Sequence, residues 1–345
     1  MAVTKKADDS AYRQFRRELE TGNLGNLYIF HGEETYLRDH YLGELKKRLL
    51  TGGLDDFNYH ALQGKDLSLR RLQETVDAMP MMSEHTFVVV TDYDMDRGGK
   101  EELLEFLSDL PEYVCLVFVY DVLEYKIDQR SKLAKLLKEK GLVVDFLRQD
   151  QNDLTGWIAR RFRALGHEIG TEEAKYMIFL CGDLMTGLIS EIEKVGAYAK
   201  EKRVTRQDID AVATPQLDAV IFRLTDAVAE GNYDKAFSVL GDLLHLQEPP
   251  IRILSVLGKQ VRQLYAACLA KKNGKGTTWL MELLGMRYSF PAEKLMRSAR
   301  SFSVSWCRRA LIHCEKADLL LKSTVADGRE VLTDLLLDMA VGEEV

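Results

Sequence analysis

The first 150 residues alternate between short apolar runs and stretches with helical spacing. Each run is rich in Val, Ile, Phe or Tyr, and several show no polar alternation, as expected of strands that are covered on both faces. Helical stretches such as residues 37–50 and 100–110 lie between the runs. This alternation predicts an α/β domain with a parallel five-stranded sheet. The strand candidates are residues 27–31, 58–62, 86–91, 115–120 and 141–146.

The β signal stops after Phe146, and the remaining pattern is helical. From Leu154 the apolar residues follow one helix face through Phe162, and three to four short helices fit before Pro215. Beyond Pro215 the chain is helical throughout, and from Cys307 to Leu321 a seam of small and apolar residues runs at steps of three and four, which is typical of a helical bundle core. We therefore expect three domains: an α/β domain (1–148), a small helical domain (149–214) and an all-α domain (215–345).

Composition fits this organisation. The 345 residues are 46% hydrophobic and 29% charged. The sequence contains no run of eighteen apolar residues, which a membrane-spanning helix would need. The first fifteen residues lack the apolar segment of a secretory signal, so the cytoplasm is the expected compartment and no membrane partner is expected. The five cysteines have no CxxC spacing, which favours buried free thiols over a metal site.

The net charge of -7 hides an asymmetry. Residues 251–310 contain twelve Lys/Arg and two Glu, a difference of +10. Such separation is typical of a nucleic-acid face on an otherwise acidic protein, although solvated helix faces give the same count.

The turn after the first strand is where a phosphate-binding loop would lie, but its chemistry is missing. Such a loop needs several glycines, a lysine and a Ser/Thr next to that lysine. Here Gly32 is followed by Glu33 and Glu34, and no lysine is present. A carboxylate about 4 Å from a phosphate costs on the order of 4 kcal/mol at a surface-like dielectric, so we expect no ATP here.

The other expected parts of an ATPase are also incomplete. The fourth strand runs into Asp121, as a Walker-B strand would, but Val122 stands where an active enzyme would have glutamate. The segment GKGTT at residues 274–278 follows a helical stretch and is interpreted as a loop with two lysines. No HExxH or GxSxG pattern occurs, and we predict a non-catalytic protein without cofactor or metal.

Four segments in order resemble the delta subunit family of the bacterial DNA polymerase III clamp loader, whose members are degenerate relatives of AAA+ ATPases. They carry the family's degenerate phosphate loop, its Lys-x-Asp-x-Arg helix start, its Gly-Asp-Leu helix without a sensor arginine, and a block in the third domain. The segments are LYIFHGEETYLRDHYL (27–42), LVFVYDVLEYKIDQRSKLAKLLK (116–138), GDLMTGLISEIEKVGAY (182–198) and EPPIRILSVLGKQVRQLY (248–265).

The resemblance implies a site and a function. Delta subunits bind the ring-shaped sliding beta clamp through an exposed hydrophobic wedge before the central strand, and they open the ring. The wedge maps onto Met79, Pro80, Met81 and Met82, with Met81 and Met82 at positions that are usually Leu and Phe. The alternative for this segment is a buried helix end.

The resemblance also implies partners. The third domain resembles the collar that joins the delta subunit to the gamma/tau ATPase subunits and to delta-prime, close to primer-template DNA. On this basis Arg287, Lys294, Arg297 and Arg300 are expected at phosphates. Tyr288 either stacks on an unpaired base or packs beside Phe290. Two other functions stay open, namely a divergent P-loop nucleotide hydrolase and a helical DNA-binding scaffold that is unrelated to clamps.

Overall fold

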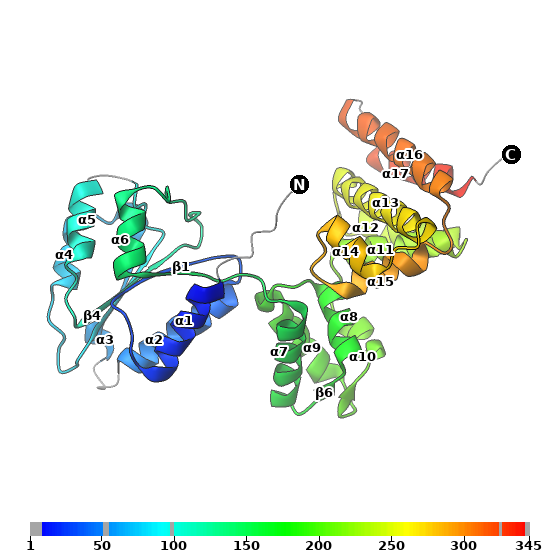
Figure 1. Ribbon diagram of the computed structural model, residues 1–345. Coiled ribbons are helices and arrows are strands. Elements are labelled where there is room, and N and C mark those ends of the chain that lie inside the picture. The colour runs from blue at the N-terminus through cyan, green and yellow to red at the C-terminus, as the bar shows by residue number, and fades with distance from the viewer. Residues whose placement is uncertain (1–8, 51–54, 97–99, 324–325, 342–345) are drawn as a thin grey trace. The chain divides into compact units, whose positions relative to one another are not determined.

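The computed structural model describes residues 9–50, 55–96, 100–323 and 326–341. The first eight residues, on which the expectation about a secretory signal partly rests, lie outside this part. The chain divides into two compact units, Met1–Arg148 and Gln149–Val345, called here the first and second unit (Figure 1). A further division at residues 214 and 215 stays a prediction.

The first unit is built on a five-stranded, fully parallel sheet in the order β2-β3-β4-β1-β5, which confirms the predicted fold class. Two predicted strands are shifted by one residue and the fifth is shorter, because an apolar run fixes a strand's core better than its ends. The strands are β1 (Leu27–His31), β2 (Tyr59–Gln63), β3 (Thr86–Thr91), β4 (Val114–Val119) and β5 (Leu142–Asp145).

Helices cover both faces of this sheet (Figure 1). Alternate residues of β1 explain why: Tyr28 and Phe30 pack against Phe15 of α1, whereas Ile29 joins the core formed with α4, α5 and α6. Both sets are buried, so the strands show no polar alternation. The helices are α1 (Asp9–Thr21), α2 (Thr35–Leu49), α3 (Asp55–Asn58), η1 (Gly64–Asp66), α4 (Leu69–Val76), α5 (Lys100–Ser108) and α6 (Lys132–Lys140).

The second unit is almost entirely helical. Its helices are α7 (Gln151–Ala164), α8 (Thr171–Cys181), α9 (Met185–Tyr198), α10 (Arg206–Val212), α11 (Leu217–Ala229), α12 (Tyr233–His245), α13 (Pro250–Lys272), α14 (Thr277–Leu284), α15 (Ser289–Ser298), α16 (Val304–Ser323) and α17 (Gly328–Ala340). The expectation that strands end at Phe146 was wrong, because β6 (Glu168–Ile169) pairs with β7 (Arg203–Val204). Two-residue strands carry too few positions for a periodicity signal.

The predicted bundle seam is part of the core of the second unit. Cys307, Ala310, Cys314 and Ala317 of α16 are buried. All five cysteines are free and buried, as predicted. Within the described ranges, no helix is long and apolar enough to cross a membrane.

Candidate functional site

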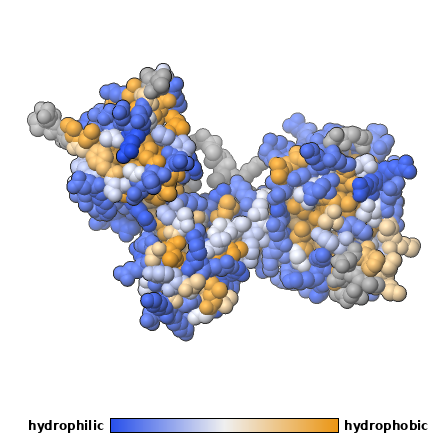
Figure 2. All heavy atoms as spheres, turned by 180° about the vertical axis from the view of Figure 1, so that it is seen from behind, coloured by the Kyte–Doolittle hydropathy of each residue, from blue (hydrophilic) through white to orange (hydrophobic). Residues whose placement is uncertain are grey.

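The segment between α4 and β3, residues 77–85, presents methionines to solvent and is called here the methionine loop. Met79 is 83% exposed, Met81 53% and Met82 85%, while Pro80 is half-buried. Figure 2 shows exposed apolar surface, in orange, among polar residues of the first unit, which lies at the right in this view. The alternative of a buried helix end is wrong, because α4 ends at Val76, before these residues.

The methionine loop is anchored at its first residue and at its middle residue. The Tyr113 hydroxyl donates to the Asp77 carbonyl oxygen at 3.1 Å. The Asn58 amide binds both backbone groups of Met81: its Oδ1 accepts from the Met81 N–H at 2.7 Å, and its Nδ2 donates to the Met81 carbonyl oxygen at 2.9 Å. Met82 then adopts a positive φ of 50°. These contacts define the backbone path that exposes the three methionines.

The turn after β1, where a phosphate loop would lie, is filled by the end of β5. Gly32 has a φ of 120°, and a Cβ at this position would lie 2.5 Å from the Phe146 carbonyl oxygen. The Glu34 N–H donates to that same oxygen at 2.8 Å, and the Glu34 side chain is fully buried. Glu33 forms an ion pair with Arg148. Backbone and carboxylates thus stand where a nucleotide site would need open space and cations.

The end of β4 is also occupied by internal contacts. Asp121 Oδ1 lies 2.8 Å from Nη1 of Arg38, whose side chain is only 7% exposed. The Asp92 carboxylate accepts backbone N–H groups from Asp121, Val122 and Leu123. Val122 itself is 89% exposed. The single Walker-type acid therefore stabilises an internal arginine and has no carboxylate neighbour at position 122.

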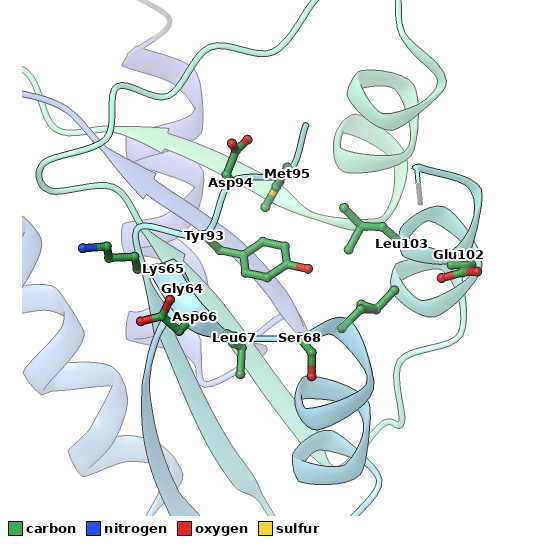
Figure 3. A pocket seen from close by; sticks show the side chains of 11 residues that line it. Gly64, Lys65, Asp66, Leu67, Ser68, Tyr93, Asp94, Met95, Glu102 and Leu103 are labelled. Carbon is green, nitrogen blue, oxygen red and sulfur yellow. The ribbon is translucent and has the colours of Figure 1, made fainter. Parts of the chain in front are cut away.

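A cavity of about 440 Å³ lies at the carboxyl ends of β2 and β3, between η1, α4 and α5 (Figure 3). The Tyr93 ring points into it from the segment after β3. Its charged lining residues are Lys65, Asp66, Asp94 and Glu102. Three carboxylates against one lysine make this cavity electrostatically unsuitable for a nucleotide triphosphate.

The predicted basic residues of the second unit have different environments. Arg287, Arg297 and Arg300 are exposed. Arg297 and Arg300 line a second cavity of about 520 Å³, whose other charged lining residues are Lys271 and Glu293. Lys271 was not singled out from the sequence, although it contributes to the charge excess of residues 251–310. Lys294 is half-buried and forms an ion pair with Asp226, so its charge is compensated within the second unit.

Tyr288 is anchored by its hydroxyl. It donates to the Asp183 carboxylate at 3.0 Å, with the Gln149 carbonyl oxygen at 3.2 Å as a second acceptor. Its ring is half-buried. Phe290 packs against the rings of Tyr176 and Phe179. Base stacking by Tyr288 stays a prediction, and it would have to use the exposed part of a fixed ring.

No group of three or more His, Cys, Asp or Glu side chains is arranged to hold a metal ion in the part of the chain that the structure describes. At the strand ends near Gly32, His31 Nδ1 lies 3.6 Å from Asp145 Oδ1. Burial lowers the pKa of His31 and raises the pKa of Asp145. This pair lies against the closed turn and contributes to its packing.

Two family models match the chain, and together they cover more than half of it. Residues 28–147 match DNA polymerase III, delta subunit, and residues 218–339 match the C-terminal domain of the DNA polymerase III delta subunit. The chain belongs to the DNA polymerase III delta subunit family. The resemblance carried by the four sequence segments is thereby confirmed.

Full-length relatives support the assignment. The chain is 23% identical to DNA polymerase III subunit delta of Bacillus subtilis, with 94% of this chain and 95% of that protein covered. It is also 23% identical to a probable DNA polymerase III subunit delta of Aquifex aeolicus, with 90% of each covered. The solved Bacillus subtilis DNA clamp loader delta protein (YqeN) has the same fold, with a TM-score of 0.55, 21% identity and coverage of 95% and 99%.

Proposed function

We propose that this delta-family chain is a clamp-loader component that binds and opens the sliding beta clamp through Met79, Pro80, Met81 and Met82. The observation that carries the proposal is the exposure of three methionines on one anchored loop next to β3. Large apolar side chains exposed together are typical of interaction sites. Methionine suits a pocket on a partner because its side chain is flexible and polarisable.

The burial of the methionine side chains against the clamp can supply a large part of the binding free energy. Burying one methionine side chain contributes about 1.5–3 kcal/mol. Met82 is 85% exposed and Met81 53%, so together they contribute about 2 kcal/mol or more, which corresponds to at least about 30-fold in affinity. The loop can thus account for a substantial part of a specific interface.

Ring opening follows from differential affinity. A partner that binds the open ring more tightly than the closed ring shifts the equilibrium by that difference in free energy. The methionine loop would anchor the chain, and the surface around it would oppose closure. Nucleotide on neighbouring ATPase subunits would control when the loop is presented.

The proposal includes that the chain neither binds nor hydrolyses ATP itself and acts as a non-catalytic accessory subunit. The backbone at Phe146 fills the space beside Gly32, and the next two residues are the exposed Glu33 and the buried Glu34, where a phosphate loop would carry a cation. Asp121 is engaged by Arg38, and Val122 cannot act as a base. Each of these features opposes binding or activation of a nucleotide.

The proposed partners are the sliding beta clamp, the gamma/tau ATPase subunits, delta-prime and primer-template DNA, all in the cytoplasm. For DNA, the support is the exposure of Arg287, Arg297 and Arg300 and the basic cavity that includes Lys271. Phosphate contacts of this kind position DNA without reading its sequence.

The decisive experiment measures binding of the chain to its cognate clamp by surface plasmon resonance. Met81→Ala/Met82→Ala should weaken binding about 30-fold or more. The control is Leu246→Ala, which truncates an apolar side chain that is 74% exposed in the second unit. The control should bind normally, and all variants should unfold at the wild-type temperature. Unchanged affinity of the double variant would remove the site assignment.

Binding measurements with Mg-ATP, by calorimetry, and with DNA test the two alternative functions, a nucleotide hydrolase and a DNA-binding scaffold. A divergent nucleotide hydrolase would bind Mg-ATP with micromolar affinity as an isolated chain, whereas we expect no binding heat. A DNA-binding scaffold would bind DNA in a salt-sensitive way without binding the clamp.

A further inference from the structure

The contact between α3 and the methionine loop is the basis of a further inference, which rests on the proposed clamp-binding function. Asn58, the last residue of α3, is only 2% exposed. Its amide makes two hydrogen bonds to one residue, accepting from the Met81 N–H at 2.7 Å and donating to the Met81 carbonyl oxygen at 2.9 Å. A side chain thus occupies both backbone groups of Met81, as a neighbouring strand would.

The residue after this contact is conformationally unfavourable. Met82 has a φ of 50°, a region that non-glycine residues enter at an energetic cost. Such a backbone persists only where its surroundings hold it. The Asn58 contact fixes the preceding residue, and Met82 is presented with 85% of its side chain exposed. The loop is therefore held in an unfavourable conformation that exposes an apolar side chain.

The residue before Asn58 is also apolar and exposed. Phe57 is 59% exposed although it is a large aromatic residue. It lies on α3, next in sequence to the residue that contacts Met81. Aromatic residues are enriched where interfaces gain most of their binding energy. A further exposed apolar side chain therefore lies on α3, next in sequence to the residue that holds the methionine loop.

We propose that α3 completes the clamp-binding site, with Asn58 as a positioning residue that preorganises Met81 and Met82, and Phe57 as an additional apolar contact to the clamp. A loop that is already ordered loses less conformational entropy on binding than a loose one. Asn58 acts through the methionines and does not itself contact the clamp. Phe57 contributes by burial of its ring.

A double-mutant cycle tests the positioning role. Asn58→Ala should weaken clamp binding about tenfold, because the ordering cost then falls on the binding step. Added to Met81→Ala/Met82→Ala, the same substitution should cause no further loss, since nothing is left to position. An equal loss in both backgrounds would overturn the positioning role.

Hydrogen exchange tests the contact without any substitution. The Met81 amide of the free wild-type chain should exchange more slowly than an unstructured amide, because Asn58 accepts its hydrogen. Fast exchange would overturn the inference even if Asn58→Ala failed to fold.

The contribution of Phe57 is tested with a matched pair of variants. Phe57→Ala should weaken clamp binding about tenfold, whereas Phe57→Leu should retain most of the affinity because it keeps apolar bulk. Equal affinity of Phe57→Ala and wild type would remove Phe57 from the site. Wild-type binding that depends on the methionines but on neither Phe57 nor Asn58 would end this inference and leave the proposed function intact. Methionine-independent binding would end both.

Discussion

Lys294 of α15 and Asp226 of α11 form an ion pair inside the second unit, with side chains that are 21% and 26% exposed. Ser298, one turn further along α15, donates its hydroxyl to the other oxygen of Asp226 at 3.3 Å. The Asp226 carboxylate therefore joins α11 to α15 through residues that are 68 positions apart in sequence. A lysine that was predicted to contact a DNA phosphate thus has a structural partner within the second unit.

Replacement of Lys294 should affect stability more than DNA binding. Lys294→Met leaves a half-buried carboxylate without its cation, which costs on the order of 1–3 kcal/mol of unfolding free energy. Urea denaturation measures this loss. The control, Lys272→Met, removes the same charge from an exposed position and should leave stability unchanged. If Lys294→Met retains full stability and loses DNA affinity, the lysine contacts DNA after all.

Arg297 and Arg300 should instead determine the salt dependence of DNA binding. Each phosphate contact contributes about 0.9 to the slope of log K against log salt on duplex DNA. The double variant Arg297→Ala/Arg300→Ala should therefore lower the slope by about 2, with little change in stability. Fluorescence titrations of primed DNA at several salt concentrations give the slope. Arg70→Ala/Arg71→Ala, on exposed residues of α4, is the charge-matched control. An unchanged slope would exclude the two arginines as phosphate contacts.

The strands of the first unit and the exposed methionines show how much of the structure the sequence could predict. The five strands were visible because runs such as residues 87–90, the centre of β3, are apolar at every position, as a strand buried on both faces requires. The exposure of Met81 and Met82 was implied by the resemblance to the delta subunit family, whose hydrophobic wedge maps onto them.

Pairings between distant side chains were not predictable in this way. Asn58 and Met81 are 23 residues apart, and no local pattern links an asparagine to one particular backbone. Likewise, Lys294 belongs to a basic stretch, and only the packing of α15 on α11 shows that Asp226 neutralises it. Charge counts identify candidate surfaces, but tertiary structure decides which charges are available.

Tyr288 provides a test that separates its hydroxyl from its ring. Tyr288→Phe removes the donor to Asp183 and should lower the stability of the chain by about 1–3 kcal/mol, because the acceptor is charged. It should leave DNA affinity unchanged, since phenylalanine keeps the aromatic face. Tyr288→Ala should lower DNA affinity as well if the ring stacks on a base, by about 1–3 kcal/mol. Equal DNA affinity of the Phe and Ala variants would exclude stacking.

The start of α10 should give the chain a defined sensitivity to acid. Thr205 and Asp208 form a capping box, in which the Asp208 carboxylate accepts from the Thr205 hydroxyl at 2.6 Å and from its backbone N–H at 2.8 Å. The hydroxyl contact first, and then the backbone contact, hold the pKa of Asp208 below its usual value. Because the folded-state pKa is lower than the unfolded one, the carboxylate contributes stability above the unfolded pKa. That contribution is lost as pH falls through the folded pKa.

Asp208→Asn should therefore destabilise the chain at neutral pH, and its difference from wild type should shrink as pH falls below about 4, the usual aspartate range. Denaturant unfolding at a series of pH values measures the difference. Thr205→Ala removes the hydroxyl, which is the main cause of the lowered pKa of Asp208. In the Thr205→Ala background, the effect of Asp208→Asn on stability should therefore depend less on pH. A difference between wild type and Asp208→Asn that stays constant down to pH values well below the usual aspartate pKa would contradict the link. The carboxyl group would then stabilise α10 equally in both protonation states, whereas its hydrogen bonds should weaken when protonation removes the negative charge.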